Sequence, residues 1–346
     1  KSKYEQVAES MRTICDGIGF SPGSNKQISY VLAHRGNFLP LTDSGKNLKT
    51  DAATLRNLED PLAGVILNYK EAQSMLSKGI NKIMGHDRAY TKYGLLSQTG
   101  RTTSSGARLP GHINIQQQFS KDYRREIRNV FLPDSGTWTD GDDSQIELRV
   151  IAYMSGDPTL LHIFQNYDQW LIDGVRRPKT SEEDIHIFTS EICGTTRKVA
   201  KNINYAFSYG GSDHTISTYA NIPLDLARMF RARLVDYMPM RWMEDMQQVG
   251  VRDGVVESLY GRKYYVGDVA KDLFECMRLA VNYPVQGTAS EIFKRQLVKV
   301  GEAGHDVAIE VHDEFVIDGK VPVDPALEWI APFKTPLEVR YLDRWE

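Results

Sequence analysis

Cysteine is scarce in this chain of 346 residues: Cys15, Cys193 and Cys276 stand far apart and are odd in number. Such a set gives neither a disulfide framework nor a zinc-binding pattern, so we expect reduced thiols in ordinary packing positions. No apolar run approaches the roughly 18 residues of a membrane span, which excludes a transmembrane protein. The first ten residues contain no apolar core of a secretion signal. We therefore expect an intracellular protein, in the cytoplasm, nucleoid or a virus-infected cell, or in an organelle.

A strong net charge is also missing, because 42 Lys and Arg residues nearly balance 45 Asp and Glu residues. Overall charge therefore does not indicate a nucleic-acid partner, although local patches decide such binding. One basic stretch stands out between Arg101 and Val130. Its six cationic residues are Arg101, Arg108, Lys121, Arg124, Arg125 and Arg128.

The hydrophobic pattern predicts a mixed architecture of about two domains. Residues 1–95 are typical of helices, with a polar, turn-rich stretch at 19–49, and a mostly helical region follows from 184 to 300. Apolar runs on both sides of residues 312–313 predict two strands joined by a tight turn. Because more than a hundred mostly helical residues separate the predicted strands, we expect an α+β domain with a helical domain inserted into it.

Clustered carboxylates follow the first predicted strand, at Asp140, Asp142 and Asp143, with Glu147 shortly after. Hard oxygen ligands of this kind suit Mg²⁺, which takes one or two carboxylates together with substrate phosphates. A solvated acidic turn is the alternative interpretation of this segment.

A second constellation lies in RKVAKNINYAFSYGG. Steps of four residues keep Arg197, Lys201, Tyr205 and Tyr209 near one helix face. Two cations followed by aromatic rings are suited to hold a triphosphate and to cover a sugar and base. A cationic surface helix with aromatic core residues is the alternative.

A third constellation is Val311–Glu314, which lies between two apolar runs. A hairpin tip there presents His312 and Asp313 to a cleft, or is simply a polar turn.

The order of these segments resembles the DNA polymerase I family, known as family A. DDSQIELR (142–149) is similar to motif A of that family, RKVAKNINYAFSYG (197–210) to motif B, and VHDE (311–314) to motif C. Further similarities occur in the same order, in TGRTTSS (99–105), INIQ (113–116), DIH (184–186), ESLYGRKYYV (257–266) and RLAVNYPVQGTA (278–289). The resemblance covers roughly residues 60–345.

The resemblance implies a right-hand α+β polymerase fold with an antiparallel palm sheet. Helical fingers would be inserted in the palm, and the thumb would be helical and partial. The implied boundaries are thumb 1–95, palm 96–149 and 276–346, and fingers 150–275.

The resemblance also implies template-directed DNA synthesis that extends a primer 3′-hydroxyl with dNTPs and releases pyrophosphate. Asp142 and Asp313 would bind two Mg²⁺ ions, with Mn²⁺ as a substitute, and the backbone carbonyl of Asp143 would complete the ligands. Glu314 would be an auxiliary carboxylate. Two metals stabilise both the attacking and the leaving oxygen of an in-line displacement.

The remaining motif residues would contact substrates. For the incoming dNTP, the matching positions are Arg197, Lys201, Tyr205, His186, Gln145 and Glu147. Glu147 would reject ribonucleotides by closing the space beside the sugar C2′ carbon, and Tyr209 would stack at the template position and hydrogen-bond Glu147. For the primer–template, they are Tyr209, Arg101, Asn114, Arg262, Asn282, Gln286 and His312.

Departures from the family pattern also appear. Asp143 replaces the usual Tyr and would add negative charge beside the metals, and Ala206 replaces a Gly in motif B. The segment between Asp318 and Pro336 is short for the family. Residues 165–183 look like an extra polar insertion.

Other functions remain open at this stage. A single-subunit RNA polymerase shares the hand and the motif order, an inactive nucleic-acid clamp would keep the fold, and a metal-dependent nuclease would also use paired carboxylates. Glu147 favours the DNA enzyme. The expected partners are primer–template DNA and dNTPs, with no membrane; the sequence identifies no protein partner.

Overall fold

The computed structural model describes residues 1–42, 45–106, 109–118, 127–174 and 177–345. The chain divides into two compact units. Unit 1 comprises residues 1–93, 104–132 and 344–346, and unit 2 comprises residues 94–103 and 133–343. Four of the six cationic residues in the predicted basic stretch, Arg108, Lys121, Arg124 and Arg125, lie outside the described residues.

Unit 1 is helical. Its elements are α1 (Ser2–Ile18), α2 (Asn25–His34), α3 (Ala52–Arg56), α4 (Pro61–Met75), the π-helical turn η1 (Leu76–Ile80), α5 (Asn81–Ile83) and the 3₁₀ turn η2 (Ile115–Gln117). A short ribbon of β1 (Lys92–Gly94) and β2 (Thr103–Ser105) lies where the chain passes between the units.

The helix α2 falls inside the stretch expected to be turn-rich. Ser24 caps it by accepting a hydrogen bond from the Gln27 amide, and Ile28 and Leu32 are fully buried. A cap and one apolar face are sufficient for a helix when tertiary packing covers that face.

Unit 2 is built around a four-stranded sheet with the strand order β6-β7-β3-β8. Its strands are β3 (Trp138–Asp143), β6 (Val307–Val311), β7 (Glu314–Asp318) and β8 (Leu337–Leu342), and all adjacent pairs are antiparallel. The strands β6 and β7 form the predicted hairpin, so the expected antiparallel sheet is confirmed. Phe315, Val316 and Ile317 of β7 are buried, and Phe315 packs with Phe293 of the long helix that precedes β6.

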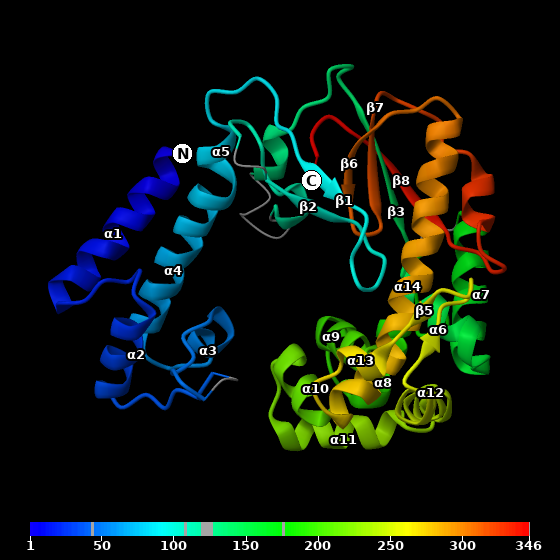
Figure 1. Cartoon of the computed structure of the whole chain (residues 1–346), viewed down its shortest axis with the longest axis horizontal. Coiled ribbons are helices and arrows are strands. Elements are labelled where there is room, and N and C mark those ends of the chain that lie inside the picture. The colour runs from blue at the N-terminus through cyan, green and yellow to red at the C-terminus, as the bar shows by residue number, and fades with distance from the viewer. Residues whose placement is uncertain (43–44, 107–108, 119–126, 175–176, 346) are drawn as a thin grey trace. The chain divides into compact units, whose positions relative to one another are not determined.

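The helices of unit 2 surround this sheet and extend beyond it. They are α6 (Ile146–Ser155), α7 (Pro158–Asp173), α8 (Ile185–Cys193), α9 (Arg197–Ser208), α10 (Asp213–Ala220), α11 (Leu224–Leu234), α12 (Met240–Asp253), α13 (Val266–Val269), α14 (Leu273–Glu302) and the 3₁₀ turn η4 (Pro325–Trp329), with the ribbon β4 (Val256–Glu257) and β5 (Lys263–Tyr264). Figure 1 shows the first turns of α14 among α8–α13 and its last turns beside the sheet. The inserted helical region is thus joined to the sheet by one long helix.

Two local features of unit 2 concern α7 and α14. Residues 165–173, part of the stretch expected to be a polar insertion, belong to α7, where Tyr167 is 1% exposed. Pro284 lies inside α14, which continues as one helix to Glu302. Burial of Val281 and Val285 beside it offsets the lost backbone hydrogen bond.

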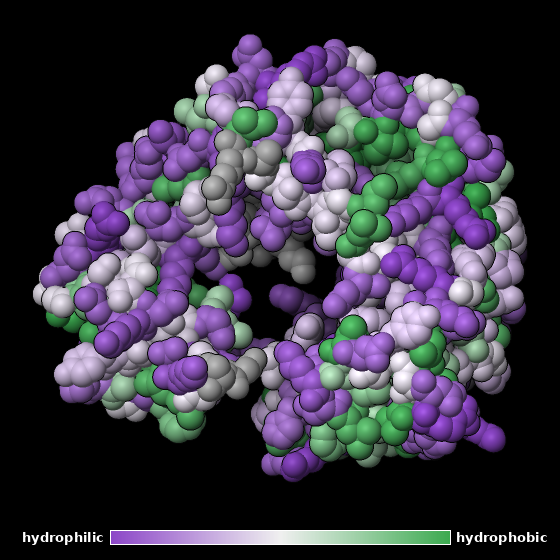
Figure 2. Space-filling model, in the orientation of Figure 1, coloured by the Kyte–Doolittle hydropathy of each residue, from purple (hydrophilic) through white to green (hydrophobic). Residues whose placement is uncertain are grey.

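Other features agree with the sequence. All three cysteines are free and buried. No described helix has both the length and the apolar character needed to cross a membrane. On the face drawn in Figure 2, hydrophilic residues predominate and hydrophobic ones form separate patches.

Gly141 in the middle of β3 is required by packing. A Cβ atom there would lie 2.5 Å from Cζ of the Phe315 ring. We expect Gly141→Ala to lower the free energy of unfolding by about 1–3 kcal/mol, the usual cost of overpacking. Guanidinium denaturation measures this. Gly301→Ala, in α14 of the same unit with nothing within 4 Å of the new Cβ, is the matched control and should cost less than about 1 kcal/mol. Equal effects of the two substitutions would contradict the packing role of Gly141.

Candidate active site

The first acidic cluster lies where β3 turns into α6. Gln145 adopts a left-handed conformation (φ 57°) between them, which lets the strand end abruptly and the helix begin at Ile146. Alternation along the strand separates the carboxylates, because neighbouring side chains point to opposite faces. Asp142 remains partly exposed, whereas Asp143 is only 3% exposed.

The β6–β7 hairpin brings a second carboxylate to the same place. His312 occupies the left-handed region (φ 62°) at its tip, so the turn is tight and Asp313 follows directly. The Asp143 amide donates a hydrogen bond to the Asp313 carbonyl at 3.1 Å, and Asp142 is paired with Glu314 across the strands. Residues 142 and 313 are therefore neighbours in unit 2, as the sequence predicted.

The electrostatics of this pair are unfavourable in isolation. Burial, and then repulsion from Asp313 and Glu314, raise the pKa of Asp142 to about 8. Burial, and then Glu147, raise the pKa of Asp313 to about 6. On the other side of β3, Glu338 is also paired with Asp142. Like charges that face each other across strands are destabilising, so this cluster has excess negative charge that a cation would offset.

The described residues contain no group of three or more His, Cys, Asp or Glu side chains arranged to hold a metal ion. A metal at Asp142 and Asp313 would therefore need further ligands, such as backbone carbonyls or substrate oxygens. Mg²⁺ commonly binds in that way, through one or two carboxylates. The residues thus fit a divalent cation that is completed by a bound substrate.

The two flanking aspartates have other partners. Asp140, fully buried, forms an ion pair with Arg340 of β8. Asp143 accepts a hydrogen bond from Nε2 of Gln296 on α14 at 3.0 Å, and burial raises the pKa of its carboxyl well above the ordinary value. The expectation that Asp143 adds a full negative charge beside the metals is therefore not supported by its surroundings.

The predicted cationic and aromatic face of α9 is present. Thr196 caps the helix, and the Lys201 Nζ lies 5.8 Å from the centroid of the Tyr205 ring, which in turn stacks 6.5 Å from Tyr209. Arg197 donates from Nε and Nη2 to the same carboxylate oxygen of Asp184, at 3.0 and 2.6 Å. Burial, and then Asp313 and Glu147, raise the pKa of Tyr205 to about 12.

His186 is buried and neutral. The Asn204 amide donates to its Nδ1 at 2.9 Å and to the Ile185 carbonyl at 3.2 Å, so Nδ1 is an acceptor and the ring proton is on Nε2. Burial lowers the pKa of His186 to about 4. It therefore supplies a neutral N–H donor and not a positive charge.

Glu147 is the centre of a second network. Its two carboxylate oxygens accept hydrogen bonds from different directions: Tyr209 Oη donates to Oε2, and Arg101 Nη2 donates to Oε1. The predicted contact between Tyr209 and Glu147 is thus present. The contact with Arg101 was not predicted.

The other predicted residues are placed as follows. Arg262 donates to the Ser97 carbonyl at 3.4 Å, and Asn282 and Gln286 are one turn apart on α14. The buried Oε1 of Gln145 has no hydrogen-bond partner among the described residues. Asn114 belongs to unit 1, where it accepts a hydrogen bond from Ser104 at 2.5 Å.

Comparison with known proteins agrees with this geometry. The family model for DNA polymerase family A matches residues 1–328. The chain belongs to DNA polymerase family A.

Relatives within family A include thermostable DNA polymerase I of Thermus aquaticus, 32% identical over 93% of this chain, and DNA polymerase I of Bacillus subtilis, 28% identical over 96%. The chain spans 41% and 39% of the length of these two relatives. A solved structure described as the polymerase domain of Pol1 from M. smegmatis, in complex with DNA primer-template and dNTP, is similar in fold. Its TM-score is 0.78 at 21% identity, over 99% of this chain and 64% of that one.

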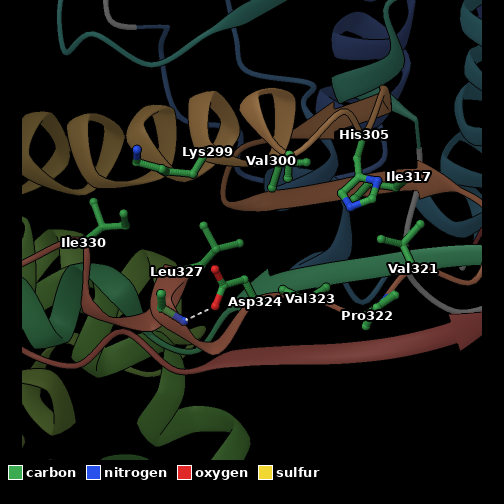
Figure 3. A pocket seen from close by; sticks show the side chains of 12 residues that line it. Lys299, Val300, His305, Ile317, Val321, Pro322, Val323, Asp324, Leu327 and Ile330 are labelled. Atoms are coloured by element: carbon green, nitrogen blue, oxygen red, sulfur yellow. Dashed lines mark hydrogen bonds between the residues drawn. The ribbon is translucent and has the colours of Figure 1, made fainter.

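Residues of the segment between Asp318 and Pro336 line a cavity behind the sheet. The cavity measures about 180 Å³ and lies between the end of α14 and the residues around η4. Figure 3 shows mostly apolar side chains around it, among them Val300, Val323 and Leu327, with His305 at one side. None of the predicted site residues lines it, so we do not assign it to catalysis.

Sequence reasoning missed the residues that reach the site from distant strands and helices. Glu338 and Arg340 on β8, and Gln296 on α14, contact the acidic cluster. The sequence around these three residues gives no sign of this contact, because only the pairing of β8 with β3 and the packing of α14 bring them to the acidic cluster.

The neutral state of His186 has a consequence for stability. Its pKa is about 4 in the folded protein and 6.5 when unperturbed, so the unfolded chain takes up the proton first. Stability from the neutral ring is present above pH 6.5 and is lost as the pH falls toward 4. Relative to His186→Gln, we expect the wild-type free energy of unfolding to fall by up to about 1.4 kcal/mol per pH unit in that window.

Urea denaturation at several pH values measures this difference. His214→Gln, which changes an exposed histidine in the same unit, should keep the wild-type slope. Parallel curves for wild type and His186→Gln would show that the ring is not held neutral.

Proposed function

We propose that this chain is the polymerase portion of a template-directed DNA polymerase. It would extend a primer 3′-hydroxyl with dNTPs, by nucleotidyl transfer that depends on two divalent metal ions and releases pyrophosphate. The observation that carries the proposal is the meeting of Asp142 and Asp313 where β3 adjoins the β6–β7 hairpin, together with the hydrogen bond from Tyr209, at the end of α9, to Glu147. The names of the relatives, and the primer-template and dNTP bound to the similar M. smegmatis domain, support the same activity.

The parts of the hand follow from this assignment. Residues 1–95 would be a partial thumb, 96–149 and 276–346 the palm, and 150–275 the fingers. The four-stranded sheet and the helices α8–α12 support the palm and fingers assignments.

Asp142 and Asp313 would be the principal metal ligands, with the Asp143 carbonyl and the auxiliary carboxylate Glu314 beside them. Mg²⁺ is the expected cofactor, and Mn²⁺ is expected to substitute. When bound, the metals activate the primer hydroxyl and neutralise charge on the phosphates. The raised pKa values of the two aspartates support this role, because a divalent cation relieves their mutual repulsion.

The α9 side chains would bind the nucleotide. Arg197 and Lys201 would hold the phosphates, and the neutral His186 would donate one hydrogen bond from Nε2. Tyr205 would pack over the sugar and base, with Gln145 near the nucleotide. Catalysis is then mainly positioning and charge neutralisation: the bond from the primer 3′-oxygen to the α-phosphorus forms while the bond from that phosphorus to the leaving pyrophosphate breaks.

The primer–template would be held along the minor groove. The residues proposed for this are Tyr209, Arg101, Asn114, Arg262, Asn282, Gln286 and His312. Acceptors in that groove differ little among base pairs, so such contacts test pair geometry without reading sequence.

Primer extension on a primed DNA template tests the proposal, with Mg²⁺ and either dNTPs or rNTPs, and with EDTA in parallel. Extension with dNTPs alone, abolished by EDTA, is the expected result. Extension with rNTPs would favour a single-subunit RNA polymerase. Salt-sensitive DNA binding without any extension would favour an inactive clamp.

Removal of one metal ligand should stop catalysis. We expect Asp313→Asn to lower the extension rate by roughly 10²-fold or more, the range for losing a preorganised electrostatic group, with primer–template affinity nearly unchanged. Asp306→Asn changes an exposed aspartate just before β6 and should extend normally. Substantial extension by Asp313→Asn would contradict the metal role.

Glu147 should control the choice of sugar. We expect Glu147→Ala to raise the ratio of ribonucleotide to deoxyribonucleotide incorporation by at least roughly tenfold, because the space beside C2′ opens. Single-nucleotide incorporation kinetics measure the ratio. Glu257→Ala, an exposed glutamate on β4, is the control, and an unchanged ratio in Glu147→Ala would remove the gate assignment.

A further inference from the structure

We propose that Arg101 is a positioning residue that sets sugar selectivity by holding Glu147, and that residues 95–102, here called the strap, are anchored to α14 and β6 in order to place it. This inference rests on the proposed function, because it takes Glu147 as the sugar gate. It assigns to Arg101 a role in addition to the proposed contact with the primer–template.

The hydrogen bonds at Glu147 support a held carboxylate. Tyr209 and Arg101 donate to different oxygens, so rotation of the carboxylate would break at least one of these bonds. The Glu147 side chain is 8% exposed and that of Arg101 is 33% exposed. The backbone of Glu147 is fixed by the buried Ile146 and Leu148 on either side, so only its side chain has freedom that needs restraint.

Side chains from α14 and β6 hold the strap on both sides of Arg101. Ser290 donates to the Gly100 carbonyl at 2.7 Å, and Thr102 donates to the Glu310 carboxylate. Ser290, Thr102 and Glu310 are each no more than 8% exposed, so the two residues that flank Arg101 are fixed in the interior. The backbone of Arg101 is therefore restrained by its two neighbours.

Further contacts extend this anchoring along the strap. Tyr283 donates to the side chain of Gln98 at 2.8 Å, and the Lys294 Nζ lies 3.5 Å from the Leu95 carbonyl. Tyr283, Ser290 and Lys294 are spaced by seven and four residues, which places them on one face of α14. Figure 1 shows the loop between β1 and β2, in cyan, running beside this helix.

Gly100 contributes to the conformation of the strap. Its φ of +81° belongs to the left-handed region that favours glycine, and a Cβ there would lie 2.2 Å from Nη1 of Arg262. The strap therefore turns sharply, immediately before Arg101, against a side chain that fills the available space.

Arg101 also balances charge at the site. Its guanidinium is the cationic partner of the Glu147 carboxylate. Loss of Arg101 would therefore slow extension with both kinds of nucleotide, in addition to releasing the gate. The ratio of the two rates isolates the effect on the gate, since a general loss of activity cancels from it.

The test compares incorporation of one dNTP and the matching rNTP in single-turnover kinetics on the same primer–template. We expect Arg101→Gln to raise the rNTP/dNTP ratio roughly tenfold, the equivalent of one lost charge-assisted hydrogen bond. Arg101→Lys should restore part of the selectivity, because it keeps the charge without the fork of donors. Combining Arg101→Gln with Glu147→Ala should leave the ratio of Glu147→Ala unchanged, because residues that act through one another are not additive.

Variants of the anchors separate positioning from DNA contact. Ser290→Ala and Thr102→Val should each raise the ratio by roughly threefold, with primer–template affinity unchanged, while Thr102→Ser keeps the hydroxyl and should behave as wild type. Ser217→Ala removes a hydroxyl that donates at 2.7 Å to the Ile222 carbonyl in another part of unit 2. It is the matched control and should keep the wild-type ratio.

The outcomes distinguish failure of the proposed function from failure of the positioning role of Arg101. Absence of dNTP extension in the wild type would defeat the proposed function, and normal selectivity in Glu147→Ala would defeat its gate. If Glu147→Ala loses selectivity while Arg101→Gln and both anchor variants keep it, the positioning role is overturned. Additive effects in the double variant would overturn it as well, since Arg101 would then act independently of Glu147.

Discussion

The pairing of β3 with the β6–β7 hairpin is the constraint on which the site depends. It brings Asp142 opposite Glu314 and next to Asp313, although like charges in this arrangement repel each other. Burial of Phe315, Val316 and Ile317 along the same strands supplies the favourable free energy that holds the sheet in this register. A shift of one residue would turn the carboxylates to the opposite face, so the hydrophobic alternation of β7 also fixes which acids meet.

The distribution of arginines around the site follows from the same constraint. Asp140 is paired with Arg340, Glu147 with Arg101 and Asp184 with Arg197. Within the described part of the chain, Asp142 and Asp313 make no ion pair. A buried carboxylate without a cation is costly, so an external cation would stabilise these two. The lack of an ion pair distinguishes the proposed metal ligands from Asp140, Glu147 and Asp184, which are paired with arginines.

Local patterns along the sequence predicted much of this site. The apolar runs around residues 312–313 predicted the hairpin, and the spacing of four from Arg197 to Tyr209 predicted the exposed face of α9. Motif order indicated the family, and the antiparallel sheet followed from it. These features depend on residues close together in the chain, where periodicity and turn chemistry are informative.

Long-range packing limited what the sequence could predict. The burial of His186 depends on Asn204, eighteen positions away, and the ion pair of Asp140 depends on Arg340, two hundred positions away. The environment of Asp143 depends on Gln296 of α14, which no local pattern around either residue indicates. The packing of α7 is a similar case: the helix has many polar residues, but Tyr167 is buried and its hydroxyl donates to Glu338 of β8 at 3.0 Å.

Among the described helices, α14 links these separate parts. Its 30 residues correspond to a length of about 45 Å. Val281 near its start packs in the core of the inserted helices, Ser290 in its middle holds the strap, and Gln296 contacts Asp143 near its end. A packed helix keeps these distances nearly constant, so α14 fixes the spacing between the core of the inserted helices, the strap and Asp143. The segment between Asp318 and Pro336, by contrast, lies over the last turns of α14 and contributes no predicted site residue.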